Sequence, residues 1–274
     1  MRVRSGQAEL ACDVFGAAAD DTRPGVVLLH AGVADRRGWR ALGPALAADH
    51  RCVAFDRRGF GDTSYEPEPH SSVRDTLTVL DAAGIDRVVA VGNSMGGRVA
   101  LDLALGHPER VAALVLIGTA VRGAPDPGPV SAALDALVRA IDAAEEAGDL
   151  DEVNRLEARL WLDGPDAPEG RVGGAARELF LDMNGRALAA ADPGPDAPLA
   201  PAWDEIERID VPVLLAVGEL DLPHVVERSA VLAARLPRGR LIVLGGVAHL
   251  PTVEGNDAFV ADVVDFLARS EVGR

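Results

Sequence analysis

Short apolar runs rich in valine, leucine and alanine alternate along this chain with segments of helical periodicity. Most of the runs are apolar at consecutive positions, as in strands that are buried on both faces. The predicted strands span residues 9–15, 26–29, 52–56, 88–92, 113–117, 213–217 and 241–244, and the clearest predicted helices span residues 71–83, 95–105, 225–235 and 257–269. Strands and helices that alternate in this way predict an α/β fold, with a mostly parallel sheet covered by helices on both faces.

The alternation stops between residues 123 and 201. Two segments rich in proline and glycine, residues 123–129 and 192–198, flank a stretch with a helical pattern and no good strand. Clusters of these residues mark connections between structural units. We therefore predict that residues 1–122 and 202–274 form the core and that residues 123–201 form a helical cap, or lid, inserted into it.

Residues 142–169 of the predicted cap carry many acidic side chains, and Arg155 and Arg159 are their only basic residues. One interpretation is a solvated helical face. The other is a charged rim above a binding site, which would disfavour strongly anionic substrates.

Composition limits the classes of partner and location. With 274 residues, of which 48% are hydrophobic, the chain can bury a large core. A net charge of −16 disfavours nucleic acid and anionic membranes as partners. No apolar run approaches the roughly 20 residues that span a bilayer, and the first residues lack the apolar region of a signal peptide, so we expect a cytoplasmic protein. Cys12 and Cys52 fall in predicted strands and are expected to be buried free thiols.

Residues 92–96 read Gly-Asn-Ser-Met-Gly and lie where a buried strand ends and a helix begins. In that context the pattern G-x-S-x-G places its serine on a sharp turn at the edge of the sheet, at the positive end of the helix. Gly92, Gly96 and Gly97 supply the small residues that such a turn needs. A serine hydroxyl is a poor nucleophile until a base takes its proton. The motif therefore predicts Ser94 as nucleophile, followed along the chain by an acid and then a histidine.

Three histidines follow Ser94. His107 lies in a helix-ending turn and is interpreted as structural. His249 lies between the last predicted strand and the last helix, in a loop that belongs at the carboxyl edge of the sheet. We predict that His249 is the base and that His224, at the start of a helix, lines the pocket.

The loop after the strand at residues 213–217 contains two acids, Glu219 and Asp221. We favour Asp221 as the orienting acid because it lies further past the strand end and can turn back towards His249. Glu219 is the alternative.

A developing oxyanion needs N–H donors that are already in place. The first predicted donor is the amide of Met95, and the second is that of Gly32, with Val33 as the alternative. His30 is a further pocket candidate and is expected to support this loop by hydrogen bonding. Four large apolar residues of the cap region are either pocket residues or contacts between cap and core: Trp161, Phe180, Met183 and Trp203.

Four separated parts of the chain resemble the α/β-hydrolase family, in particular its cap-bearing serine hydrolases. They are residues 28–32, residues 56–61, residues 92–97 together with 218–221, and residues 246–251. Related enzymes include small esterases, enol-lactone hydrolases, C–C bond hydrolases and cofactor-free haloperoxidases. The resemblance implies an eight-stranded, mostly parallel sheet with a helical cap after the sixth strand. The chain departs from the usual pattern in one place, with His30-Ala31 where the family has His-Gly.

We therefore expect a serine hydrolase that cleaves a carboxylic ester, with a lactone or thioester as alternatives, through an acyl-enzyme on Ser94, His249 and Asp221. No metal or cofactor is expected, and the partner is a small acyl substrate. C–C bond hydrolysis or perhydrolysis on the same residues is the first rival, and a ligand receptor or binding module is the second. The sequence leaves the oligomeric state open, with a homodimer as one candidate.

Overall fold

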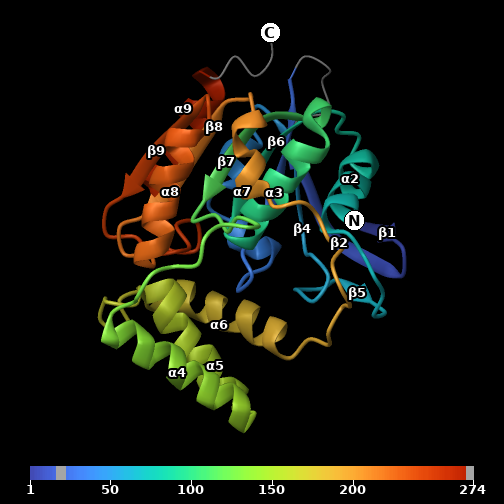
Figure 1. The fold of residues 1–274 in the computed structure, drawn as a ribbon. Coiled ribbons are helices and arrows are strands. Elements are labelled where there is room, and N and C mark those ends of the chain that lie inside the picture. The colour runs from blue at the N-terminus through green and yellow to red at the C-terminus, as the bar shows by residue number, and fades with distance from the viewer. Residues whose placement is uncertain (17–22, 270–274) are drawn as a thin grey trace.

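The computed structural model describes residues 1–16 and 23–269 of the chain and has the predicted α/β architecture, with a central sheet of nine strands (Figure 1). The strands are β1 Arg2–Ser5, β2 Ala8–Gly16, β3 Gly25–Leu29, β4 Arg51–Phe55, β5 Ser64–Tyr65, β6 Val88–Asn93, β7 Val111–Ile117, β8 Val213–Gly218 and β9 Gly239–Leu244. All seven predicted strands are present, with ends within two residues of the prediction. β1 and β5 were not predicted.

Across the sheet the strands follow the order β1-β2-β4-β3-β6-β7-β8-β9, and β5 pairs with β2 outside this order. β1 and β2 are antiparallel to their neighbours, and the strands from β4 to β9 along this order pair in parallel. The eight strands of this order correspond to the implied eight-stranded sheet, and β5 adds a ninth. Parallel strands end at the same edge, so their following loops gather on one side of the molecule.

Helices cover both faces of the sheet. The core helices are α1 Gly43–Leu46, α2 Ser72–Ala82, α3 Met95–Gly106, α7 Ala202–Glu205, α8 Pro223–Arg235 and α9 Asp257–Arg269, with the 3-10 turns η1 Arg36–Trp39, η2 Pro108–Arg110 and η4 Ile206–Arg208. Successive strand residues point to opposite faces: Val27 and Leu29 pack in the cluster that contains α2, α3 and α8, whereas Val26 and Leu28 pack in the cluster that contains α1 and α9. The consecutive apolar residues of the sequence therefore fill two cores.

Between β7 and β8 the chain forms a helical insertion of α4 Ala132–Ala147, α5 Leu150–Glu157, the π-helical turn η3 Ala158–Asp163 and α6 Gly174–Leu188. β7 is the sixth, along the chain, of the eight strands in the main order. Local chemistry sets the helix ends: Ser131 and Asp149 accept hydrogen bonds from backbone amides at the starts of α4 and α5, and Gly148 ends α4 with φ 70°. The domain boundaries at residues 123 and 201 stay a prediction. The predicted core also includes residues 17–22 and 270–274, which lie outside the described residues.

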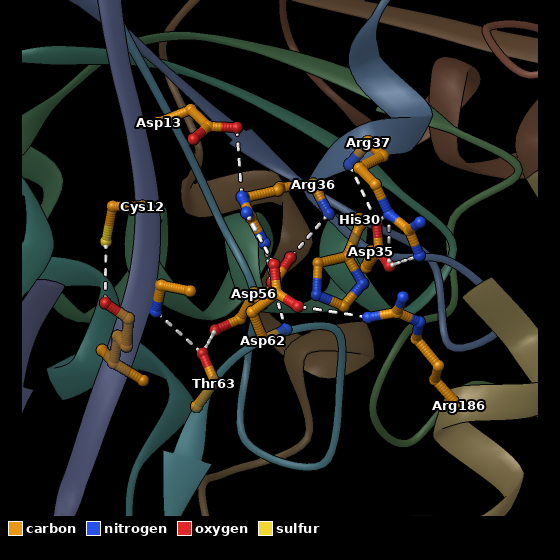
Figure 2. Close-up of polar contacts among 12 residues, drawn as sticks. Cys12, Asp13, His30, Asp35, Arg36, Arg37, Asp56, Asp62, Thr63 and Arg186 are labelled. Atoms are coloured by element: carbon orange, nitrogen blue, oxygen red, sulfur yellow. Dashed lines mark hydrogen bonds and ion pairs between the residues drawn. The ribbon is translucent and has the colours of Figure 1, made fainter. Parts of the chain in front are cut away.

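The insertion is fixed to one end of the core by apolar packing and by ion pairs. Leu134 and Leu137 of α4 pack with Val217 and Leu222 of the core. Arg186 of α6 forms an ion pair with Asp62, at 3.1 Å, as Figure 2 shows. Arg37 pairs with Asp182 of α6 at 2.6 Å. In Figure 1, α4, α5 and α6 lie together below the sheet, at one end of the core.

Two further expectations concern the thiols and the membrane. Cys12 and Cys52 are free and buried, as predicted. Burial raises the pKa of Cys12 to about 11 and that of Cys52 to about 12, so neither thiol is reactive near neutral pH. Within residues 1–16 and 23–269, no helix is long and apolar enough to cross a membrane.

Candidate active site

Ser94 lies on a strained turn between β6 and α3. Its φ of 53° is the only positive φ of a non-glycine residue in the described part of the chain. The turn is held by two backbone hydrogen bonds: the Ser94 amide donates to the carbonyl of Ile117 at 2.7 Å, and the Ala120 amide donates to the carbonyl of Ser94 at 3.2 Å. Backbone strain of this kind costs about 1–3 kcal/mol and is concentrated at functional sites.

Glycines around the turn allow backbones to approach closely. A Cβ atom on Gly96 would lie 1.9 Å from the carbonyl oxygen of Leu29, and one on Gly92 would lie 2.4 Å from the carbonyl oxygen of Gly96. Only glycine fits at both positions. The start of α3 therefore packs against the end of β3, which brings Met95 beside the loop that follows β3.

His249 and Asp221 form a buried pair. Nδ1 of His249 lies 2.7 Å from Oδ2 of Asp221, and the two residues are 3% and 6% exposed. The other carboxylate oxygen of Asp221 accepts a hydrogen bond from the Leu222 amide at 2.7 Å. A carboxylate oxygen accepts hydrogen bonds, so the Nδ1–H group of His249 is the donor to Asp221, and Nε2 takes no part in this bond.

Glu219, the alternative acid, lies elsewhere in the same loop. Its Oε2 accepts a hydrogen bond from the Gly246 amide at 2.9 Å. The structure thus brings Asp221 to the histidine and uses Glu219 to connect the loops after β8 and β9.

The order of four neighbouring strands explains why these residues lie at one edge of the sheet. β6, β7, β8 and β9 are adjacent and parallel, and Ser94, Gly118, Asp221 and His249 lie in the segments that follow them in turn. Gly118 has φ 48°, and a Cβ atom there would lie 2.9 Å from Nδ1 of His249 and 3.0 Å from Oδ2 of Asp221. Gly118 therefore keeps open the space that the pair occupies, a role that sequence reasoning missed.

Asn93, the residue before Ser94, was also missed. Its side-chain amide donates to the carbonyl of Ile117 at 3.1 Å and to the carbonyl of His249 at 3.2 Å. Asn93 is buried, so these bonds are shielded from water. It ties the serine turn to the histidine loop. The only sequence signal for this role was the position of Asn93 within the Gly-Asn-Ser-Met-Gly motif.

The insertion contacts the histidine directly. The His249 amide donates to the carbonyl of Trp161 at 3.2 Å, and the two rings lie 4.7 Å apart between centroids. Trp161 is half-buried and belongs to the π-helical turn η3.

The loop after β3 contains the predicted oxyanion donors. A Cβ atom on Gly32 would lie 3.2 Å from Cε of Met95, so the two predicted donor residues are neighbours. His30 is fully buried and supports this loop: Nδ1 lies 2.7 Å from the carbonyl oxygen of Ala31, and Nε2 accepts the Arg57 amide proton at 3.1 Å. Burial and the charge of Arg57 hold the pKa of His30 well below its ordinary value, so its ring is neutral.

The predicted pocket residues fall into different surroundings. Phe180 and Met183 have no exposed surface and pack with Ala31 in the contact between insertion and core. Val33 and Trp161 lie half-buried at the edge of the same cluster. Fully buried side chains line no open pocket, so Val33 and Trp161 are the members of this group that remain accessible.

Trp203 and His224 are separate from that cluster. Trp203 packs against the main core, with the Arg235 guanidinium 4.7 Å from the centre of its ring, so the structure does not bring it to the other candidates. His224 is half-buried at the start of α8. Burial and the neighbouring Arg228 lower its pKa, and its Nδ1 atom is buried without a hydrogen-bond partner among the described residues.

Comparison with known proteins agrees with this architecture. Residues 24–255 match the family model of the alpha/beta hydrolase fold. The chain is 32% identical over 249 residues to 2-hydroxymuconate semialdehyde hydrolase of Pseudomonas sp. (strain CF600), covering 88% of this chain and 84% of that protein. It is 32% identical over 247 residues to a pimeloyl-[acyl-carrier protein] methyl ester esterase of Neisseria meningitidis, covering 88% and 92%.

Among solved structures, an esterase from Rhodococcus sp. superimposes with a TM-score of 0.76 at 25% identity, covering 98% of each chain. The fold is thus shared by enzymes named as hydrolases and esterases. The chain belongs to the α/β-hydrolase family of enzymes.

Proposed function

We propose that this protein is a serine hydrolase that cleaves a carboxylic ester through an acyl-enzyme on Ser94. The observation that carries the proposal is the buried hydrogen bond of 2.7 Å between His249 and Asp221. This pair lies at the same edge of the sheet as Ser94, whose strained φ of 53° persists because the surrounding structure holds it. A buried acid that orients a histidine in this way is the arrangement that activates a serine hydroxyl.

The proposed reaction follows from these positions. Ser94 Oγ attacks the ester carbonyl, and His249 Nε2 takes the hydroxyl proton while Asp221 stabilises the resulting imidazolium. The amides of Met95 and Gly32 hold the negative oxygen of the tetrahedral intermediate. As that intermediate collapses, His249 gives its proton to the departing alcohol and the acyl-enzyme remains.

Water completes the cycle. His249 removes a proton from a water molecule that attacks the acyl carbonyl, and collapse of the second intermediate releases the acid and returns the proton to Ser94. A lactone or thioester would follow the same steps with a tethered alcohol or a thiol as leaving group. Every step uses protein groups and water alone.

We further propose that the insertion between β7 and β8 acts as the cap of this site, with boundaries at residues 123 and 201. Its support is the contact between Trp161 and His249, in which the insertion supplies a hydrogen-bond acceptor to the backbone of the proposed base. The insertion thus forms part of the wall of the site.

Hydrolysis of a C–C bond on the same residues is the second candidate. It is favoured by the similarity to 2-hydroxymuconate semialdehyde hydrolase, because the compound in that enzyme's name contains no ester bond. The methyl ester esterase, which is as similar to this chain, favours ester cleavage instead.

The test is a panel of p-nitrophenyl esters, lactones, thioesters and a vinylogous diketone, assayed with wild type and with Ser94→Ala. We expect turnover of esters that falls by about 10⁶ in kcat when the nucleophile is removed. A fluorophosphonate probe should label the wild type and leave Ser94→Ala unlabelled. Turnover by Ser94→Ala at the wild-type rate would contradict the nucleophile assignment, and acylation without release would favour a receptor.

A further inference from the structure

A cavity of about 230 Å³ lies beside Met95. Four parts of the chain build it: the loop after β4, the start of α2, the first turn of α3 and the segment that returns from the insertion. Three arginines face it together with two carboxylates, namely Arg57, Arg58, Arg98, Asp75 and Asp196. The wall of the cavity is therefore strongly charged.

One of these arginines is already neutralised. Arg58 lies 2.8 Å from Asp75 and 2.7 Å from Glu68. Arg98 has a weaker partner, Asp196, at 3.7 Å, and that carboxylate also accepts hydrogen bonds from the backbone and hydroxyl of Ser72. The three arginines are matched in number by Asp75, Glu68 and Asp196, but Arg57 is the arginine without a carboxylate at ion-pair distance.

Arg57 is a buried cation without a direct ion pair: its guanidinium lies 4.8 Å from the centre of the Phe60 ring, and Asp196 acts on its charge from beyond ion-pair distance. It is 6% exposed and forms no ion pair with any residue in the described ranges. Its Nη2 donates to the carbonyls of His30 and Ala31, at 3.0 and 3.2 Å, whereas its Nε is buried without a partner. Nε of Arg98, also buried, lacks a partner too. Burial and the charge of Arg98 lower the pKa of Arg57 to about 9, so the Arg57 guanidinium is charged at neutral pH.

A buried charge is costly unless an opposite charge compensates it. The planar guanidinium, with donors in a fixed fork, matches the geometry of a carboxylate or a phosphate, and of these two a carboxylate is the group that ends an acyl chain. The wall of the cavity includes Met95, which follows the nucleophile and carries a proposed oxyanion donor. An acyl chain attached to Ser94 that runs past Met95 would therefore bring its far end to the two arginines.

We propose that this cavity binds a carboxylate at the far end of the acyl group, so that preferred substrates are monoesters or lactones whose acyl chain ends in a carboxylate. The proposal rests on the proposed function and names its substrate class. It opposes the expectation that the acidic insertion disfavours anionic substrates. Acidic side chains of that insertion such as Glu145 and Glu146 are exposed, which fits a solvated helical face.

The first test compares kcat/KM for the p-nitrophenyl monoesters of adipic and pimelic acid with that for p-nitrophenyl hexanoate and heptanoate at low salt. We expect the acid-ended esters to be favoured by about 10- to 100-fold, the effect of one charge-assisted pair. Arg98→Met should reduce this ratio by about tenfold. Arg139→Met removes an equal charge from an exposed site on α4 and should leave the ratio unchanged.

A wild-type ratio at or below one, or a ratio that Arg98→Met leaves unchanged, would overturn the proposal. Arg57→Met is less useful alone because Arg57 also holds the carbonyls of His30 and Ala31. Arg57→Lys keeps the positive charge but lacks the forked N–H donors of a guanidinium, so it should retain part of the preference for acid-ended esters.

The second test measures binding without turnover. Calorimetry on Ser94→Ala should detect monomethyl adipate and give at least tenfold weaker binding of methyl hexanoate, and the double variant Ser94→Ala/Arg98→Met should lose that difference. Equal binding of the two esters would reject the cavity as a carboxylate site. Failure of the proposed function gives a different result, since no ester would then show turnover that depends on Ser94, while the calorimetric difference would persist.

Discussion

The space between the proposed base and its acid depends on one residue without a side chain. In Gly118→Ala the new methyl group would lie 2.9 Å from Nδ1 of His249 and 3.0 Å from Oδ2 of Asp221, whereas ordinary contact begins at 3.4 Å. At least one partner must therefore move by about 0.5 Å, the difference between 3.4 and 2.9 Å. The hydrogen bond of 2.7 Å that joins the pair cannot keep its geometry through such a shift.

The size of the effect can be estimated from two contributions. A misplacement of about 1 Å at a catalytic group costs about 10²-fold in rate, so we expect Gly118→Ala to lower kcat/KM by about 10- to 100-fold. The φ of 48° adds a backbone penalty for alanine, because left-handed conformations cost about 1–2 kcal/mol for residues with a Cβ atom. Activity and stability should therefore both fall.

A matched variant separates the two contributions. Gly84 has φ 68° and no heavy atom within 4 Å of an added Cβ, so Gly84→Ala carries the backbone penalty without the collision. We expect Gly118→Ala to lose at least as much unfolding free energy in urea as Gly84→Ala, and we expect a loss of kcat/KM on p-nitrophenyl acetate in Gly118→Ala alone. Equal kcat/KM values for the two folded variants would refute the proposed role of Gly118.

Three other outcomes are expected. Ser94→Gly should abolish turnover yet raise the free energy of unfolding by about 1 kcal/mol, because glycine relieves the strained φ; a less stable variant would count against strain at the turn. Asn93→Ala removes a buried donor from the carbonyl of His249, so the free energy of unfolding should fall by about 1–3 kcal/mol and kcat/KM should fall as well. Unchanged values of both would refute the role of Asn93 in joining the serine turn to the histidine loop. The hydrogen bond from Arg37 lowers the pKa of Asp182, so its stabilisation is present above the ordinary aspartate pKa of about 4 and is lost as pH falls through the lowered value. The difference in Tm between wild type and Asp182→Asn should therefore vanish on acidification, and a difference that grows would contradict this sign.

The parts of the fold that sequence predicted are those with a strong local signal. β3 and the first four residues of β6 are consecutive small or apolar residues, so each segment by itself predicts burial on both faces. β5 has only two residues and exists through its pairing with β2, a contact that leaves no local pattern. Edge strand β1 alternates exposed and buried residues over four positions, which is too short to distinguish from a loop.

The sequence predicted which loops contain the candidate site residues. The motif around Ser94 and the rule that parallel strands end at one edge were enough to select the segments after β8 and β9. Asp221 was favoured over Glu219 because it lies further past the strand end, and in the structure Asp221 bonds to His249 whereas Glu219 bonds to Gly246. Gly118 carried no signal, since its role depends on two residues more than 100 positions further along the chain.

The histidine loop is held from two sides, and this has a consequence for any motion of the insertion. Asn93 of the core bonds to the carbonyl of His249, while Trp161 of the insertion accepts the amide proton of the same residue. Arg171, also from the insertion, donates to the carbonyl of Gly246 at 2.8 Å. Displacement of the insertion would therefore remove two hydrogen bonds from the loop that carries the base while leaving the serine turn intact. The position of His249, the proposed base, is thus coupled to the position of the insertion through the same contacts.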